Sequence, residues 1–305
     1  MRGNMNKILV LGSINIDFVA FTERFPKPGE TINGISFNIF QGGKGANQAI
    51  ALAKLGCPTW MLGKIGDDKY STIAIDSLKK YYVNIEFIKV DKNASTGSAS
   101  IWVNKQGENS IIVNHGANAY VSRSFINKNE ALFNETQWFL SQLEVPVSSV
   151  VQGLKIAKKN NMYTVIDPAP VQKPQNSQFW NLIDFLLPNE IELEELTGET
   201  NILNAINYLN SKGVKEVVVK MGAKGAGYKK NNQLHIIPSF QAGEIIDTTG
   251  AGDCFAAGFI KGMIEHNNIE KAIKMANLVA SYSVQKKGAA ISFPEKDEVN
   301  WNLLN

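Results

Sequence analysis

Residues 247–259 read DTTGAGDCFAAGF, and no other turn in the chain carries as much information. Two aspartates flank a Thr-Thr-Gly-Ala-Gly turn, and the small apolar residues that follow predict a helix beginning near Asp253. Asp253 could cap this helix, because aspartate readily accepts hydrogen bonds from the free N–H groups of a first turn. It could instead accept a proton beside an anion site, because a glycine-rich turn at a helix N-terminus binds phosphate. On this stretch alone, capping is the favoured interpretation.

The composition excludes several classes of protein. The 305 residues are 44% hydrophobic and 19% charged, which suits one large α/β domain or two ordinary ones. With 31 basic and 28 acidic residues, the net charge of +3 favours neither nucleic acid nor a membrane surface as a partner. Two distant cysteines and three scattered histidines indicate neither a disulfide framework nor a zinc site.

The location of the protein follows from the same survey. No apolar run reaches transmembrane length, and the apolar segment near the N-terminus is too short for a signal peptide. We therefore expect a soluble protein of the reducing cytoplasm.

Strand and helix patterns alternate along most of the chain. This alternation predicts an α/β fold with a mostly parallel sheet and helices on both faces. The predicted strands lie in residues 7–12, 58–66, 136–143, 162–170, 184–189 and 215–222. The predicted helices lie in residues 45–56, 68–83, 148–160, 190–198, 253–265 and 269–286.

Two segments, about 16–40 and 96–113, do not follow this alternation. Each shows short strands of period two joined by a Pro/Gly or Gln-Gly turn. They predict a small antiparallel sheet, here called the lid, that covers a single domain spanning residues 1–305. The sequence contains no interdomain linker, low-complexity tract or internal repeat.

Common nucleotide and hydrolase motifs are absent. FQGGKGANQ resembles a P-loop, but Lys44 is followed by Gly45 where the Walker pattern needs Ser or Thr. No G-x-G-x-x-G follows the first strand, and no G-x-S-x-G elbow is present.

Polar side chains instead gather near predicted strand ends, where open α/β sheets bind ligands. Each could be a cap or turn residue, but five together predict a site for a polyhydroxylated ligand. They are Asn15, Asp17, Lys44, Asn47 and Glu144.

A family resemblance joins these motifs. The segments GSINID, PKPGET, QGGKGANQA, STGSA, QLEVP, DPAP, PNEIELEELTG, DTTGAGDCFAAGF and KKGAAIS occur in this order across residues 11–292. The chain resembles the ribokinase (PfkB-type) family of sugar kinases, and it is similar to the bacterial ribokinases in particular. This resemblance implies a three-layer sandwich with a β lid.

The resemblance also implies roles at the site. Asp253 would be the general base, and backbone N–H groups of Gly250, Ala251 and Gly252 would form an anion hole for the γ-phosphoryl group. Such a turn is suited to this role, because phosphoryl transfer depends mainly on positioning and charge stabilisation. The sugar would be bound by Asn15, Asp17, Gly43, Lys44, Asn47, Glu144 and Asp253.

ATP and two kinds of cation are implied as cofactors. The nucleotide and its Mg²⁺ would be bound by Asn189, Glu192, Lys220, Gly222, Gly225, Gly252 and Asn277. At position 220 this sequence has Lys, where well-known family members have Thr. A monovalent cation, usually K⁺, would be bound by Asp247, Thr249, Ser283, Lys286, Gly288 and Ser292. Asp247 could instead be an ordinary turn-capping aspartate.

We therefore expect ATP-dependent phosphorylation of D-ribose at O5 by a homodimer formed through the lid. One alternative is a kinase for deoxyribose, fructose or adenosine. The other is a sugar-binding regulator without turnover, because a fold does not guarantee an activity.

Overall fold

The computed structural model describes residues 6–172, 177–241 and 243–304. Within these residues the larger sheet has nine strands. Their spatial order is β13 (Gln233–Ile237), β12 (Ala226–Lys230), β11 (Glu216–Lys220), β10 (Phe185–Leu186), β9 (Tyr163–Ile166), β8 (Trp138–Ser141), β1 (Ile8–Leu11), β4 (Thr59–Gly66) and β5 (Ile88–Asp91). The strands from β11 to β5 pair in parallel, and β12 and β13 add an antiparallel edge. The prediction of a mostly parallel sheet is confirmed.

Both faces of the central strands of this sheet are buried, as expected when helices cover each side. Successive side chains of β1 point to opposite faces of the sheet: Ile8 and Val10 belong to one apolar core, and Leu9 and Leu11 belong to the other. The first core includes residues of α1 (Lys44–Lys54), α2 (Lys69–Lys80), α8 (Ala251–His266) and α9 (Ile269–Ser283). The second includes residues of α3 (Arg123–Lys128), α4 (Glu130–Phe133), α5 (Val147–Lys159), α6 (Glu190–Thr197) and α7 (Ile202–Lys212).

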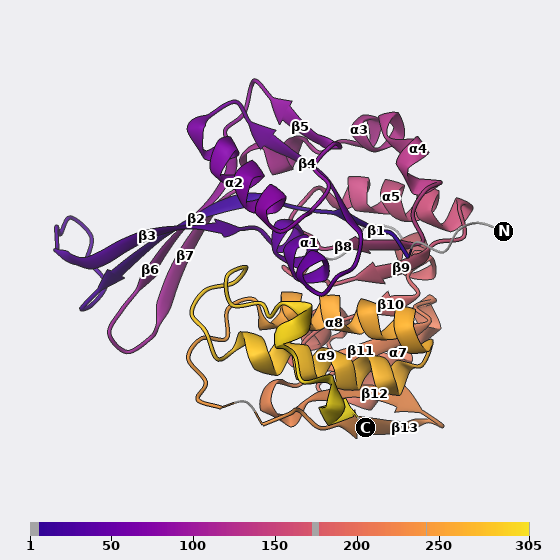
Figure 1. Cartoon of the computed structure of the whole chain (residues 1–305). Coiled ribbons are helices and arrows are strands. Elements are labelled where there is room, and N and C mark those ends of the chain that lie inside the picture. Colours follow the sequence, from indigo (N-terminus) through magenta and orange to yellow (C-terminus); the bar gives the residue numbers. More distant parts are fainter. Residues whose placement is uncertain (1–5, 173–176, 242, 305) are drawn as a thin grey trace.

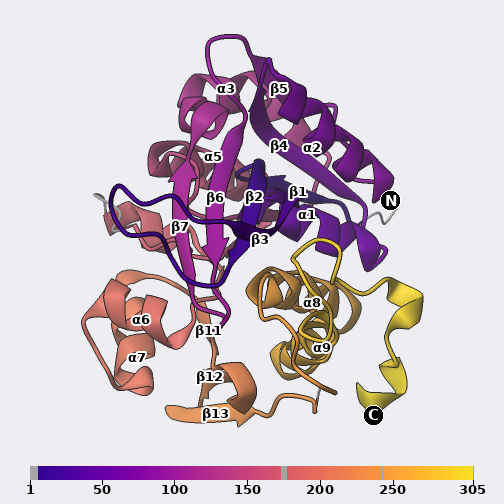
Figure 2. The ribbon, with the colours of Figure 1, turned by 90° about the vertical axis from the view of Figure 1, so that its left-hand side faces the viewer.

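The smaller sheet falls on the predicted lid segments and projects away from the main body (Figures 1 and 2). Among the described residues it has four strands, in the order β3 (Gly34–Gly42), β2 (Asn15–Thr22), β6 (Gly97–Val103) and β7 (Asn109–Asn114). Two antiparallel hairpins, β2–β3 and β6–β7, are confirmed. The hairpins join through a parallel pair, β2–β6, which the sequence did not predict.

Helix α7 and strand β12 are not among the predicted elements. Helix α7 has apolar residues at helical spacing, but its three asparagines have low helix propensity, and three of the five residues of β12 are glycine or lysine. Packing decides their structure: Ala205, Ile206 and Leu209 of α7 are buried in the second core. Within the part of the chain that the structure describes, no helix is long and apolar enough to cross a membrane.

Candidate active site

Asp253 lies in the first turn of α8, and its side chain is almost fully buried. The N-cap of α8 is Gly250, at φ 77°, and no side chain caps this end. The capping role favoured from the stretch alone is therefore wrong. Asp253 instead accepts hydrogen bonds from Gln48 Nε2 at 2.9 Å and Asn47 Nδ2 at 3.4 Å. Burial raises the pKa of Asp253 to about 6, although Lys44 acts against this shift.

The turn before α8 has no room for a side chain at position 250. Gly250 adopts a left-handed conformation, and a Cβ atom there would approach the ring of Phe293 to 2.8 Å. The Ala251 N–H group donates to the Thr248 carbonyl oxygen at 3.2 Å. The next N–H groups of a first helical turn have no partner inside the helix, so that of Gly252 can face an anion. The geometry suits a phosphate group above this turn.

Glu144, Lys44 and Asn15 converge from three elements. Glu144 follows β8, and its Oε2 accepts hydrogen bonds from the Lys44 backbone N–H at 3.0 Å and from the Ser13 hydroxyl. Burial alone would lower the pKa of Lys44, but nearby carboxylates, above all Asp253, raise it above its usual range. Asn15 is buried on β2, where its Oδ1 accepts a hydrogen bond from Asn118 Nδ2 at 2.7 Å.

Asp17 and Asn47 offer acceptors that the protein leaves partly unsatisfied. Burial raises the pKa of Asp17 to about 7, and the charges of Glu144 and Asp253 add to the shift. A Cβ atom on Gly42 would collide with the Asp17 carboxylate, so this glycine leaves room for the side chain. The buried Oδ1 of Asn47 has no hydrogen-bond partner among the residues that the structure describes. Buried acceptors normally find a donor, so hydroxyl groups of a ligand suit this position.

Gly43 is the N-cap of α1, with φ 86°. A Cβ atom there would lie 2.7 Å from the backbone nitrogen of Asn15, so a side chain would push β2 and α1 apart. This close contact brings the two sugar-site segments together.

Three buried residues of the site were not predicted from the sequence. Gln48 Nε2 donates to both Asp253 Oδ1, at 2.9 Å, and Asp167 Oδ2, at 2.8 Å. Gln142 Nε2 donates in turn to Gln48 Oε1 at 2.5 Å. Asp167 follows β9 within the quoted motif DPAP, so its position after a strand was the available signal. Gln48 and Gln142 carried a similar signal, because they lie in the quoted motifs QGGKGANQA and QLEVP and Gln142 directly follows β8.

Asn189, Glu192 and Lys220 lie together, as the resemblance implied. Asn189 caps α6 and forms a capping box with Glu192, in which each side chain accepts the other's backbone N–H at 2.8 Å. Lys220 Nζ lies 2.8 Å from Asp167 Oδ1 and 3.8 Å from Glu192 Oε2. Burial raises the pKa of Glu192, and Lys220 acts in the opposite direction.

Gly222, Gly225 and Asn277 shape the segments beside this cluster. Gly222 and Gly225 have φ values of 56° and 100°, and a Cβ atom on Gly225 would collide with the Ile237 carbonyl. Asn277 of α9 donates to the Ile237 and Pro238 carbonyl oxygens at 2.9 and 3.1 Å. Asn277 thereby fixes the loop after β13 to α9.

Five of the six residues predicted for the monovalent cation lie in two adjoining loops, and the sixth, Ser283, ends α9. Asp247 accepts the backbone N–H groups of Thr249 at 2.9 Å and Gly288 at 2.8 Å, which joins the loops. The hydroxyls of Ser283 and Ser292 donate to carbonyl oxygens three residues earlier. The Lys286 ammonium lies 3.3 Å from Glu298, so only the backbone oxygen of Lys286 is a candidate ligand. Oxygen donors of this kind fit a hard cation.

Comparison with known proteins identifies the family. The model of the pfkB family of carbohydrate kinases matches residues 5–296. The chain belongs to this family. Among pfkB-family relatives, a ribokinase from Haemophilus influenzae is 38% identical over 300 residues, which cover 96% of this chain and 97% of the relative. A deoxyribokinase from Salmonella typhi is 35% identical over 298 residues, with the same two shares.

A solved structure of a pfkB-family relative has a similar fold. Arabidopsis thaliana ribokinase complexed with ribose and ATP is similar with a TM-score of 0.91 and 34% identity. The match covers 98% of each chain. The family and the ribokinase-like fold predicted from the sequence are therefore confirmed.

Proposed function

We propose that this protein transfers the γ-phosphoryl group of ATP to the O5 hydroxyl of D-ribose and forms ribose 5-phosphate. The observation that carries this proposal is the position of Asp253, buried between the Gly-Ala-Gly turn and the sugar-site side chains. The ribokinase from Haemophilus influenzae and the ribokinase complexed with ribose and ATP support this choice of substrates.

Different residues of the site bind the sugar, accept its proton and stabilise the phosphoryl group in the proposed reaction. Asn15, Asp17, Gly43, Lys44, Asn47 and Glu144 bind the sugar, with Asp17 accepting hydrogen bonds from two ring hydroxyls. Asp253 takes the proton of O5 as the new oxygen–phosphorus bond forms. Its raised pKa of about 6 makes it a better base than an ordinary aspartate while it stays largely ionised at pH 7. Gly250, Ala251 and Gly252 offer N–H groups to the phosphoryl oxygens.

ATP lies beside Asn189, Glu192, Lys220, Gly222, Gly225 and Asn277 in this proposal. Mg²⁺, when bound, neutralises phosphate charge, and it prefers to keep several waters. Glu192 fits such a water-mediated site, because its carboxylate is partly buried beside the nucleotide segment. The free, buried cysteines Cys57 and Cys254 agree with a cytoplasmic location, which remains part of the proposal.

A monovalent cation, K⁺, belongs to the proposal at the Asp247 loops. Its ligands would be oxygens of Asp247, Thr249, Ser283, Lys286, Gly288 and Ser292. Hydrogen bonds from Thr249 and Gly288 outweigh desolvation and lower the pKa of Asp247, so this carboxylate stays ionised. The ion would stabilise the loop that leads directly into the Gly-Ala-Gly turn.

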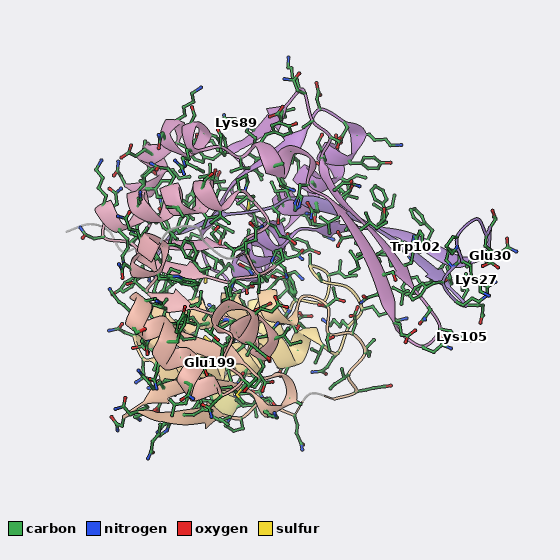
Figure 3. All side chains as sticks on the ribbon, turned by 180° about the vertical axis from the view of Figure 1, so that it is seen from behind. Lys27, Glu30, Lys89, Trp102, Lys105 and Glu199 are labelled. Carbon is green, nitrogen blue, oxygen red and sulfur yellow. The ribbon has the colours of Figure 1, made fainter. Side chains whose placement is uncertain are left out.

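The smaller sheet is proposed to be the lid and the dimer interface. Paired residues of its strands share a face, and one face presents Phe37, Ile39, Trp102 and Ile112, all exposed in the monomer. Asp17 lies on the opposite face. Trp102 lies on the projecting hairpins, and Lys27, Glu30 and Lys105 lie near their far end (Figure 3). An exposed apolar face of this kind favours association with a second copy.

Deoxyribose is the strongest competing acceptor, because a relative of nearly equal identity is a deoxyribokinase. Fructose and adenosine remain wider alternatives. A sugar-binding regulator without turnover is disfavoured, because Asp253 and the Gly-Ala-Gly turn are intact.

The test is the specificity constant, kcat/KM, for D-ribose, 2-deoxyribose, fructose and adenosine under identical ATP, Mg²⁺ and K⁺. We expect ribose to exceed deoxyribose by about tenfold or more, since an unpaired buried polar group costs about 1–3 kcal/mol. If another acceptor is preferred, the ribose assignment fails and the sugar-kinase assignment survives. If none of the four is phosphorylated, the regulator is the better description.

A further inference from the structure

Lys220 places a positive charge where the helix dipole is also positive. Its Nζ lies 3.5 Å from the point that a Cβ atom on Gly252 would occupy, beside the N-terminus of α8. The side chain is 13% exposed. A largely buried cation at a helix N-terminus is unfavourable, because both charges repel each other and the ammonium group loses water. Such a position is reasonable where a multiply charged anion binds.

We propose that Lys220 contacts the γ-phosphoryl group of ATP and stabilises its charge in the transition state. The inference rests on the proposed kinase activity and extends it, because it assigns Lys220 to the chemical step as well as to nucleotide binding. In that step the acceptor oxygen bonds to the γ-phosphorus, and the bond to the β,γ-bridging oxygen breaks. The acceptor proton passes to Asp253, and ADP leaves. A fixed ammonium group beside Gly252 reaches the phosphoryl oxygens during this exchange.

Asp167 holds Lys220 in position without ATP. Its Oδ1 lies 2.8 Å from Lys220 Nζ, and its Oδ2 accepts a hydrogen bond from Gln48 Nε2, which also donates to Asp253. Asp167 is 2% exposed, so its charge needs this partner. A continuous chain of hydrogen bonds thus runs from Lys220 through Asp167 and Gln48 to Asp253. It connects the cation beside the phosphate turn, Lys220, to the proposed base beside the acceptor, Asp253.

The competing interpretation is that Lys220 only neutralises Asp167. Replacing Lys220 alone would leave Asp167 buried and unpaired, which can destabilise the fold. The experiment therefore compares Asp167→Asn with the double variant Asp167→Asn/Lys220→Met, because neither leaves a carboxylate at position 167 without its ammonium partner. Glu192 loses only its longer contact of 3.8 Å with Lys220 in the double variant. Both are measured with whichever acceptor the wild type phosphorylates best, together with thermal stability and sugar binding.

We expect the double variant to have a kcat about 10²–10³-fold below that of Asp167→Asn, the usual loss when one group that stabilises transition-state charge is removed. The KM for MgATP should change much less. Asp167→Asn/Lys220→Arg should recover part of kcat, because arginine restores the charge. The matched control is Lys212→Met, which removes one exposed positive charge on α7 and should leave both constants unchanged.

Three results would overturn the proposal. The first is an equal kcat for Asp167→Asn and the double variant. The second is a raised KM for MgATP with kcat unchanged, which would limit Lys220 to ground-state binding. The third is a loss of kcat that follows a loss of sugar binding and stability and is not recovered by arginine. A wild type that phosphorylates no acceptor would instead refute the proposed function, so the two failures are distinguishable.

Discussion

Asp253 occupies the first turn of a helix, yet its carboxylate bonds to side chains of another helix. Its partners, Gln48 and Asn47, lie about two hundred residues earlier, on α1. A capping aspartate would keep an ordinary low pKa, because backbone N–H groups favour the charged form. Burial instead raises the pKa of Asp253, which matches a group that must accept a proton.

Asp253→Asn should lower kcat by at least about 10²-fold, a typical contribution of a general base. Sugar and ATP binding should remain nearly intact, because asparagine has almost the same shape. In the wild type, kcat should fall as the pH drops through about 6, since the base is then protonated, and the variant should lack this limb. Steady-state kinetics between pH 5 and 8, with binding measured calorimetrically, check both expectations. Turnover within a few-fold of wild type would remove Asp253 from the role of base.

At the scale of elements, the four-stranded sheet is poorly supported by its own packing. Every residue of β7 and most residues of β3 are exposed, although many are apolar. A sheet with so little burial has a low local free energy of unfolding. Two of its strands nevertheless have one end at the sugar site: β2 begins at Asn15 and β3 ends at Gly42.

Ribose binding should protect residues 18–40 and 96–113 from hydrogen exchange. The sugar would bridge β2 to the main body, and closure would exclude water that competes as a phosphoryl acceptor. Exchange measured with and without ribose tests this, with β8 in the central sheet as an internal reference that should not change. Identical protection of both segments in the two conditions would argue against a closing lid.

Asp247 joins two loops beside the Gly-Ala-Gly turn, where the monovalent cation is proposed to bind. Millimolar K⁺ should raise kcat more than Na⁺ or Li⁺ does, because a ring of backbone oxygens selects a cation by its size and dehydration cost. Asp247→Asn should reduce the response to K⁺, since it removes the charge that attracts the ion. Activity assays after exhaustive dialysis, with each chloride salt added back, provide the measurement. The same activity in all three salts would make these loops purely structural.

At the scale of the whole molecule, the lid sheet exposes an apolar face that the monomer cannot cover. Phe37 is 61% exposed and Ile112 is 62% exposed, and both lie on the face opposite to Asp17. Soluble monomers seldom expose a continuous apolar face of this kind. Pairing two lids would bury it and stiffen both sheets at once.

The wild type should therefore be a dimer of 33.5 kDa chains, and Phe37→Glu should convert it to a monomer. A charge introduced into the centre of an apolar interface remains unpaired when buried and costs several kcal/mol. Light scattering after gel filtration, at micromolar protein, distinguishes the two states. Lys27→Glu at the exposed end of the lid is the control and should leave the mass unchanged. A monomeric wild type would reject the lid-to-lid dimer.

The sequence alone determined the alternating architecture, because buried parallel strands and amphipathic helices have distinct local periodicities. It also pointed to the turn before Asp253 and the polar residues near strand ends, where short motifs carry their own chemistry. The stretch around Asp253 favoured a cap when taken alone, and the family resemblance implied a base. Strand β12 and the parallel β2–β6 pair gave no local signal.

Only the tertiary structure decided these points, because each depends on residues far apart in the chain. The bonds from Gln48 show that Asp253 is not a cap, and Asp167 reaches Lys220 across 53 positions. No window of sequence contains such a contact, since it forms only when parallel strands bring their ends to one edge of the sheet. Burial then sets the raised pKa values of Asp17 and Asp253, which composition and spacing cannot express.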